Sequence, residues 1–350
     1  MKRIIQMGIM AIILSLAIIG CQNSQNHSTI SVNVALEDGA MNQKDAIAEA
    51  ISQETADVVL VGADSINADE YGFESAIPSE YLETMDEKCG TVNQIEYQTY
   101  DYFGDGAPIT KKANIYLPYG YDESKKYNVL YLMHGIGGDE NEWGMARKDS
   151  YVKSIMDHLI ANGEIEPFIV VTPNGRSGKD FANTNGDWGQ FYVFGQELKN
   201  DLIPYIEQNY ATYAEYDEEG YDLSVNREHR AMAGLSMGGM QTINIGICEN
   251  LELFSWYGAF SAAPTSNPAS KVAQCITEKS EYPINYFYNI CGTEDEIAYN
   301  SAATAAKDLA SVCPSMVVGE NYMWQELPGG HDFNIWYLGF YNFAKTAFKG

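Results

Sequence analysis

The chain of 350 residues is short of basic side chains, with 21 lysines and arginines against 48 aspartates and glutamates and a formal net charge of −27. Proteins that bind nucleic acid need lysine and arginine in clusters to meet the phosphates. The deficit therefore argues against nucleic acid as a partner. It also provides no attraction for anionic substrates, so a neutral or weakly charged substrate is expected.

Cysteines at the paired spacing of a metal site are missing as well. Besides Cys21 the sequence holds five cysteines, an odd number, and none of them has the C-x-x-C spacing of a zinc site. At most two disulfides can form among these five, which are Cys89, Cys248, Cys275, Cys291 and Cys313. A chain of this length with 45% hydrophobic residues can bury an ordinary core without them.

Only one long apolar run is present, and it lies at the N-terminus. It covers residues 7–19, follows Lys2 and Arg3, and is shorter than the about 20 residues that a membrane-spanning helix needs. A basic start followed by such a run is typical of an export signal. No second apolar stretch approaches membrane length, so the remaining chain is expected to lie outside the cytoplasm.

The run ends in Ile18-Ile19-Gly20-Cys21, which resembles the bacterial lipobox, where cleavage precedes a lipidated cysteine. We therefore expect residues 1–20 to be a lipoprotein signal peptide and Cys21 to anchor the protein at a bacterial cell surface. A diacylglycerol group brings the two acyl chains that stable anchoring requires. The alternatives are a simple signal peptide with an incidental cysteine and an uncleaved anchor.

The organisation of the chain changes near residue 90. Residues 21–89 are polar and acidic and suit a tether or an N-terminal extension, with a possible helix at 43–53 and a strand at 58–61. Whether this stretch packs on the main domain is left open. From Thr91 strand-like runs alternate with helix-length segments, which predicts a single α/β domain over residues 90–350.

Eight strands with helical crossovers are expected in this domain, in a predominantly parallel sheet flanked by helices. The strands are predicted at 94–102, 113–117, 128–133, 168–172, 231–233, 254–260, 286–290 and 323–327. The helices are predicted at 151–161, 196–208, 239–248, 302–312 and 335–348. In such sheets the chemistry lies at the carboxyl ends of the strands, so the residues after each strand are the candidates.

Residues 234–238 have the sequence G-L-S-M-G, which fits the pattern G-x-S-x-G. They stand between an apolar strand and a helix-length segment, and a sharp turn in that position needs glycines to avoid steric collisions. Ser236 is therefore the candidate nucleophile. In this class of fold the order along the chain is serine, then acid, then histidine, and His331 is the one histidine after Ser236. It lies in a glycine-rich loop after the last predicted strand.

The acid must lie between these two residues, in the loop after the strand at 286–290. That loop contains three carboxylates, and Asp295 is preferred because a short side chain at the loop tip can meet the imidazole directly. Glu294 and Glu296 remain alternatives. Asp308 lies in a helical pattern and is expected to be a solvated surface residue.

A developing oxyanion needs two preorganised N–H donors. The amide of Met237, directly after the nucleophile, is the first candidate. The second is the amide of Ile136, in the loop H-G-I-G-G at 134–138 that follows a predicted strand. His134 is expected to hold this loop by a hydrogen bond and to take no part in the chemistry.

Over residues 90–350 the chain resembles the "putative esterase" family, which includes feruloyl esterases of carbohydrate esterase family 1, formylglutathione hydrolases and mycolyltransferases. The resemblance rests on five segments: YLPYGYD (116–122), LMHGIGG (132–138), GLSMGG (234–239), CGTED (291–295) and GGHDF (329–333). It implies an α/β-hydrolase fold, a serine esterase with no metal or organic cofactor, and Asp295 as the acid. The feruloyl branch implies release of hydroxycinnamates from arabinoxylan.

Aromatic residues between the strands fit a phenolic or sugar substrate, because their faces can stack on either ring. Trp143, Trp188 and Tyr192 are the candidate substrate contacts, and Phe194 lies in the same region, although all four could equally be packing residues. The alternative functions are an acetylxylan or broad carboxylic esterase and an acyltransferase. A surface glycan-binding protein that keeps the fold without turnover is the alternative outside enzymes.

Overall fold

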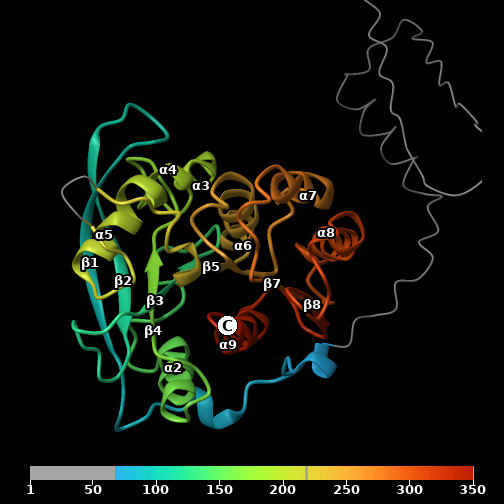
Figure 1. Cartoon of the computed structure of the whole chain (residues 1–350), viewed down its shortest axis with the longest axis horizontal. Coiled ribbons are helices and arrows are strands. Elements are labelled where there is room, and N and C mark those ends of the chain that lie inside the picture. The colour runs from blue at the N-terminus through green and yellow to red at the C-terminus, as the bar shows by residue number, and fades with distance from the viewer. Residues whose placement is uncertain (1–67, 217–219, 350) are drawn as a thin grey trace, which may run out of the picture. The chain divides into compact units, whose positions relative to one another are not determined.

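The computed structural model describes residues 68–216 and 220–349, which form an eight-stranded sheet with helices on both faces (Figure 1). The predicted signal peptide at 1–20, Cys21 and the predicted elements at 43–53 and 58–61 lie outside the described residues. The strands are β1 (Thr91–Tyr100), β2 (Pro108–Leu117), β3 (Asn128–Met133), β4 (Phe168–Pro173), β5 (Arg230–Leu235), β6 (Trp256–Phe260), β7 (Tyr286–Gly292) and β8 (Tyr322–Leu327).

The strand order in the sheet is β1-β2-β4-β3-β5-β6-β7-β8. β1 pairs antiparallel with β2, and β2 pairs antiparallel with β4. All pairs among β3 to β8 are parallel, so these six strands end at one edge of the sheet. The prediction of a predominantly parallel sheet of eight strands is confirmed, and every predicted strand overlaps an observed one.

The helices follow most of the predicted segments. They are α2 (Tyr151–Ala161), α3 (Gly189–Tyr192), α4 (Phe194–Glu197), α5 (Ile203–Asn209), α6 (Met237–Gln241), α7 (Ala269–Glu278), α8 (Tyr299–Val312) and α9 (Phe333–Thr346). Two segments are π-helical, η3 (Leu198–Leu202) and η5 (Thr242–Glu249), and three are 3₁₀ turns, η1 (Ala68–Tyr71), η2 (Ser79–Leu82) and η4 (Arg227–His229). The predicted helix at 196–208 thus covers parts of α4 and α5 joined by η3.

Two apolar cores lie on opposite faces of the sheet, because successive strand residues point to opposite sides. In β3, Val129 and Tyr131 belong to the core under α4 to α8, whereas Leu130 and Leu132 belong to the core under α2 and α9. All four side chains are buried. This burial on both faces explains why β3 reads as an unbroken apolar run in the sequence.

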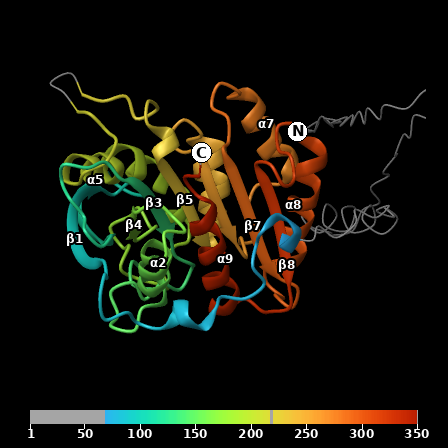
Figure 2. The ribbon, with the colours of Figure 1, turned by 60° about the horizontal axis from the view of Figure 1, so that its bottom comes forward.

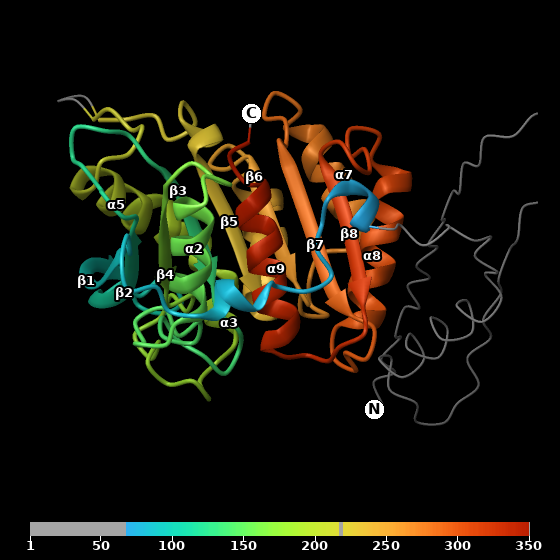
Figure 3. The ribbon, with the colours of Figure 1, turned by 90° about the horizontal axis from the view of Figure 1, so that it is seen from below.

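A segment before β1, residues 68–89, packs against the sheet domain and is called the strap here. Its first turn, η1, lies beside β8 and its second, η2, lies beside α2, so the strap crosses α9 (Figure 2, Figure 3). Phe73 is buried and stacks on Tyr288 of β7 at a centroid distance of 4.8 Å. Asn342 of α9 accepts a hydrogen bond from the amide of Glu74 and donates one to its carbonyl, at 3.0 and 2.9 Å.

The strap extends the domain to the N-terminal side of the predicted boundary at residue 90, since residues 68–89 belong to the same compact unit as the sheet. Its few apolar anchors, such as Phe73 and Tyr81, are separated by polar and acidic residues. Gly72 and Pro78 interrupt the stretch, which is why the segment looks like a tether and not like a helix in the sequence.

Three further observations concern only residues 68–216 and 220–349. No helix among them has both the length and the apolar character needed to cross a membrane. Their five cysteines are all free thiols. They contain no group of three or more histidine, cysteine, aspartate or glutamate side chains placed to hold a metal ion.

Candidate active site

Ser236 stands at the sharp turn between β5 and α6, at the carboxyl edge of the parallel strands. Its backbone has φ 51° and ψ −113°, a conformation that residues other than glycine rarely adopt. The turn is held from both sides: the amide of Ser236 donates to the carbonyl of Phe260 at 2.9 Å, and its carbonyl accepts from Ala263 at 3.0 Å. A Cβ on Gly238 would lie 2.6 Å from the carbonyl oxygen of Met133, so only glycine fits there.

His331 follows β8 and precedes α9. Its Nε2 lies 3.0 Å from Oγ of Ser236. The next residue, Asp332, caps α9 by accepting a hydrogen bond from the amide of Asn334 at 2.8 Å. The indole of Trp336 meets the imidazole edge-on at a centroid distance of 5.1 Å. The helix start and the indole together fix where the imidazole ring lies.

Asp295 lies in the loop after β7, and its Oδ2 is 2.7 Å from Nδ1 of His331. Its Oδ1 accepts hydrogen bonds from the amides of Ile297 and Ala298, at 3.0 and 2.8 Å. Burial opposes ionisation of this carboxyl, but the bonds from the Ala298 amide and from His331 outweigh it and lower the pKa of Asp295. A carboxylate facing Nδ1 keeps the proton there, so Nε2 is free to accept the hydroxyl proton of Ser236.

The other carboxylates considered in the sequence lie elsewhere. Glu294 and Glu296 flank Asp295 in the same loop but are exposed, and Asp308 is an exposed residue of α8. Among the described residues, Asp295 is the carboxylate that meets His331. The structure therefore brings Ser236, His331 and Asp295 together as a chain of two hydrogen bonds.

The two predicted oxyanion donors lie beside this chain. Met237 begins α6, and the side chains of Met237 and Ile136 belong to the same small apolar cluster. The loop of Ile136 lies against Ser236, since a Cβ on Gly135 would be 3.5 Å from the Cβ of Ser236. Among the described residues neither amide, of Ile136 or of Met237, donates a hydrogen bond to a protein acceptor. Both N–H groups are thus available to a ligand.

His134 holds the loop of Ile136, as the sequence predicted. Its Nε2 accepts from the amide of Gly175 at 2.8 Å, which places the ring proton on Nδ1, and Nδ1 donates to the carbonyl of Gly135 at 2.7 Å. Burial lowers the pKa of His134 to about 4, so the ring is neutral at physiological pH.

Residues 109–339 match the family model described as "Putative esterase". The chain belongs to this esterase family. The match runs from β2 to the middle of α9 and therefore includes Ser236, Asp295 and His331.

Two curated relatives of the esterase are xylanases by name. It is 35% identical over 242 residues to endo-1,4-beta-xylanase Y of Acetivibrio thermocellus, covering 65% of this chain and 20% of the relative. It is 31% identical over 265 residues to an endo-1,4-beta-xylanase/feruloyl esterase of Xylanibacter ruminicola, covering 74% of this chain and 32% of the relative. The esterase thus spans only a fifth to a third of the length of these relatives.

Solved structures confirm the α/β-hydrolase fold predicted for the esterase. One is the feruloyl esterase module of Clostridium thermocellum, a serine-to-alanine mutant in complex with sinapinate. It is 29% identical with a TM-score of 0.65, over 79% of this chain and 95% of that one. Another is a ferulic acid esterase of Anaeromyces mucronatus, 25% identical with a TM-score of 0.60, over 79% of this chain and 97% of that one.

The aromatic residues predicted to contact the substrate of the esterase fall into two groups. Trp188 and Tyr192 flank α3 and are 61% and 38% exposed, so their rings are accessible. The prediction for Trp143 is wrong: it is 1% exposed, and its Nε1 donates to the carbonyl of Met133 at 3.0 Å. Its ring fills the core between β6 and α9, because a residue soon after a strand can fold back under the sheet. Phe194 is buried as well.

Sequence reasoning missed Arg176. It is buried directly after β4, and its guanidinium donates to the carbonyls of Ile136 and Gly138. The signal that could have identified it is its place, because a residue just after a parallel strand lies at the edge of the sheet where the chemistry is expected.

Proposed function

We propose that the protein is a serine carboxylic ester hydrolase in which Ser236 is the nucleophile, His331 the general base and Asp295 the residue that orients the histidine. The observation that carries this proposal is the pair of hydrogen bonds, 3.0 Å from Oγ of Ser236 to Nε2 and 2.7 Å from Nδ1 to the carboxylate. The membership in the esterase family supports it.

In the first half of the reaction, His331 takes the proton of Ser236 as Oγ attacks the ester carbonyl carbon. The carbonyl oxygen becomes an oxyanion, which accepts hydrogen bonds from the amides of Met237 and Ile136. The ionised carboxylate of Asp295 stabilises the imidazolium. The tetrahedral intermediate collapses, the alcohol leaves with the proton from His331, and the acyl group stays on Ser236.

The second half repeats these steps with water. His331 removes a proton from the water molecule as its oxygen attacks the acyl carbon, and the same two amides hold the oxyanion. Collapse returns the proton to Oγ of Ser236 and releases the carboxylic acid. Every group needed for both halves comes from this chain.

We infer that the substrate is a hydroxycinnamate ester of arabinoxylan, so that the protein acts as a feruloyl esterase. The names of the relatives support this assignment, since one is an endo-1,4-beta-xylanase and another an endo-1,4-beta-xylanase/feruloyl esterase. The exposed rings of Trp188 and Tyr192, at the same edge of the sheet as Ser236, provide faces for a phenolic ring or a pentose.

The test is hydrolysis of methyl ferulate, 4-nitrophenyl acetate and acetylated xylan by the parent protein and by Ser236→Ala. Ferulate release that disappears in the variant is the expected result. Activity on acetyl esters alone would keep the mechanism and assign the protein to deacetylation. No activity on any ester, with xylan bound equally by both proteins, would contradict the enzyme and favour a glycan-binding protein.

We also propose that the protein is held at the cell surface by a lipid on Cys21, in keeping with its action on an external polysaccharide. Labelling of the cells with a palmitate analogue should mark the parent protein. Cys21→Ser should lose the label and enter the medium, whereas a labelled Cys21→Ser protein would contradict this anchor.

A further inference from the structure

The loop that carries Ile136 is held from outside by one buried side chain. Arg176 donates from Nη1 to the carbonyl of Gly138 at 2.7 Å and from Nη2 to the carbonyl of Ile136. Its guanidinium also lies over the ring of Phe191, 4.7 Å from the centroid. Phe191 packs in the same cluster as Met237 and Ile136. Arg176 therefore contacts the loop of Ile136 directly and the cluster that contains Met237 through Phe191.

Three carbonyls of this loop accept hydrogen bonds from buried side chains. The carbonyl of Gly135 accepts from His134, and those of Ile136 and Gly138 accept from Arg176. The amide of Ile136 shares a peptide plane with the carbonyl of Gly135, so the N–H points in the opposite direction. Removing the guanidinium would free the peptide groups that follow Ile136 and Gly138, so the backbone next to the Ile136 amide would lose its support.

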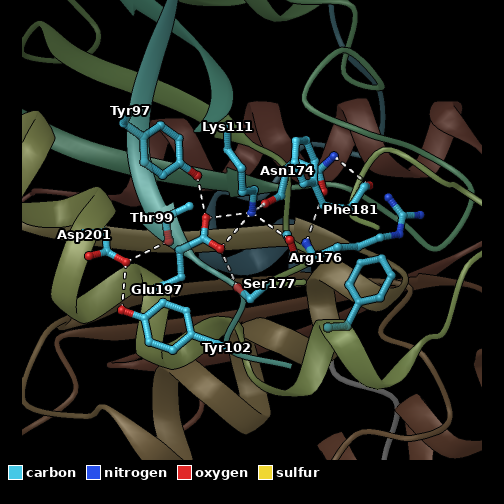
Figure 4. Close-up of polar contacts among 12 residues, drawn as sticks. Tyr97, Thr99, Tyr102, Lys111, Asn174, Arg176, Ser177, Phe181, Glu197 and Asp201 are labelled. Atoms are coloured by element: carbon cyan, nitrogen blue, oxygen red, sulfur yellow. Dashed lines mark hydrogen bonds and ion pairs between the residues drawn. The ribbon is translucent and has the colours of Figure 1, made fainter. Parts of the chain in front are cut away.

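The backbone of Arg176 is itself fixed by a buried ion pair (Figure 4). Nζ of Lys111 donates to the carbonyls of Asn174 and Arg176, at 2.8 and 2.7 Å, and to both carboxylate oxygens of Glu197, at 2.6 and 2.8 Å. Glu197 also accepts from the hydroxyl of Ser177 at 2.6 Å. Lys111 and Glu197 are fully buried, so their attraction is little screened by solvent.

Other elements pin the same short segment. The carbonyl of Gly175 accepts from Gln241 of α6 at 2.8 Å, and its amide donates to His134. The amide of Ser177 donates to the carbonyl of Gln190 at 3.1 Å. Residues 174–177 are thus tied to β2, α4 and α6 and cannot move independently of the sheet. A segment held this firmly is a rigid base for the guanidinium.

We propose that Arg176 is a positioning residue that holds the amide of Ile136 as the second oxyanion donor. This inference rests on the proposed function, because it assigns a role in stabilising the oxyanion formed at Ser236. Arg176 acts through the loop and does not touch the substrate. Its effect belongs to the transition state, in which the oxyanion exists, and leaves binding of the neutral ester unchanged.

The experiment compares the purified parent chain with Arg176→Gln and Arg176→Lys on methyl ferulate, with rates expressed per titrated active site. We expect kcat to fall by roughly 100-fold in Arg176→Gln and roughly tenfold in Arg176→Lys, with KM within about twofold of the parent. The inhibition constant of phenylboronic acid, which forms a tetrahedral adduct with an active serine, should rise in parallel with the loss of kcat/KM.

Arg227→Lys is the matched control. Arg227 is also buried and donates only to backbone carbonyls, those of Leu251, Phe254 and Pro283, but it lies at the amino ends of the strands. Its variant should lose thermal stability while kcat and the boronic acid constant stay within about twofold of the parent. A purely structural role for Arg176 would make its variants behave in the same way.

Parent values of kcat and of the boronic acid constant in both Arg176 variants would overturn the inference. Failure of both to fold, with Arg227→Lys folded, would also overturn it, because Arg176 would then serve the fold. Ser236→Ala distinguishes a failure of the proposed function from a failure of the role assigned to Arg176. If Ser236→Ala stays active, the proposed function is wrong; if it is inactive while the Arg176 variants are fully active, only the role of Arg176 is wrong.

Discussion

At the scale of single residues, the geometry of the site depends on which hydrogen bonds each polar atom makes. Asp295 uses one carboxylate oxygen for two backbone amides and the other for His331, so rotation of its side chain would break three bonds. The bonds to Ile297 and Ala298 come from its own loop. The loop therefore presents an aspartate whose orientation is set before any substrate arrives.

Replacing Asp295 by asparagine should lower kcat by about 10³- to 10⁴-fold with little change in KM, because an amide favours the wrong tautomer of His331. The pKa of Asp295 is lowered, so the carboxylate is ionised at neutral pH and its loss is felt fully there. Steady-state kinetics on methyl ferulate measures the effect. Glu294→Gln and Glu296→Gln, in the same loop, should keep the parent kcat. A large loss of kcat in either variant would mean that the replaced glutamate, and not Asp295, orients His331.

His134 makes stability depend on pH with a defined sign. Burial lowers its pKa to about 4 from 6.5, so between these values the unfolded chain binds a proton that the folded chain does not. The free energy of unfolding should therefore decrease as the pH falls from 6.5 to 4, by about 3 kcal/mol from this residue. Urea unfolding of the parent and of His134→Gln should show a stability difference that shrinks over this range. A difference independent of pH would contradict it.

At the scale of elements, α9 links the active site to the strap. It begins two residues after His331, its Trp336 contacts that imidazole, and its Asn342 is bonded to Glu74 of the strap. The strap thus supports the helix that fixes the position of the catalytic histidine. Its contribution is local packing against α9 and β7.

Phe73→Ala should lower the free energy of unfolding by about 3 kcal/mol, because it removes a buried ring stacked on Tyr288 and leaves a cavity. Urea unfolding at neutral pH gives the value. Glu80→Ala, at an exposed position of the same strap, should change stability by less than about 0.5 kcal/mol. An equally small effect of Phe73→Ala would mean that packing of the strap does not stabilise the domain.

The elements differ in how well the sequence predicts them, and the reason is burial. β3 and α2 are predicted to the residue, since β3 is an unbroken apolar run and α2 a clear amphipathic one. α7 is not predicted although its buried residues recur at helical spacing, because two alanines and a cysteine make its buried stripe only weakly apolar. The π-helical η3 is invisible to a search for a period of 3.6 residues.

The residues of the candidate site also differ in how well the sequence predicts them. Motif order and strand position lead to Ser236, Asp295 and His331, because parallel strands bring their following loops to one edge of the sheet. Trp143 is misassigned and Arg176 is missed, since the direction of a side chain after a strand depends on contacts that are distant in sequence. Lys111 and Glu197, 86 positions apart, carry no local sign of their pairing.

At the scale of the whole molecule, the net charge of −27 sets a background of repulsion among carboxylates. Salt screens such interactions, with a Debye length of about 30 Å at 0.01 M and about 10 Å at 0.1 M. The melting temperature should therefore rise by a few degrees between about 0.01 and 0.5 M sodium chloride at pH 7. The rise should shrink near pH 4, where many carboxylates are protonated. A melting temperature that falls with salt at pH 7 would show that ion pairs dominate.

The strap also determines how the domain would respond to force. With the proposed anchor at Cys21 and a polymer bound at the active site, the protein would be pulled between its N-terminal side and that site. The load enters the described domain at the strap, where Phe73 and Glu74 meet Tyr288 and Asn342, before it reaches β1 along the chain. Under tension these contacts would break first, so the strap would detach from the domain while the sheet stays folded.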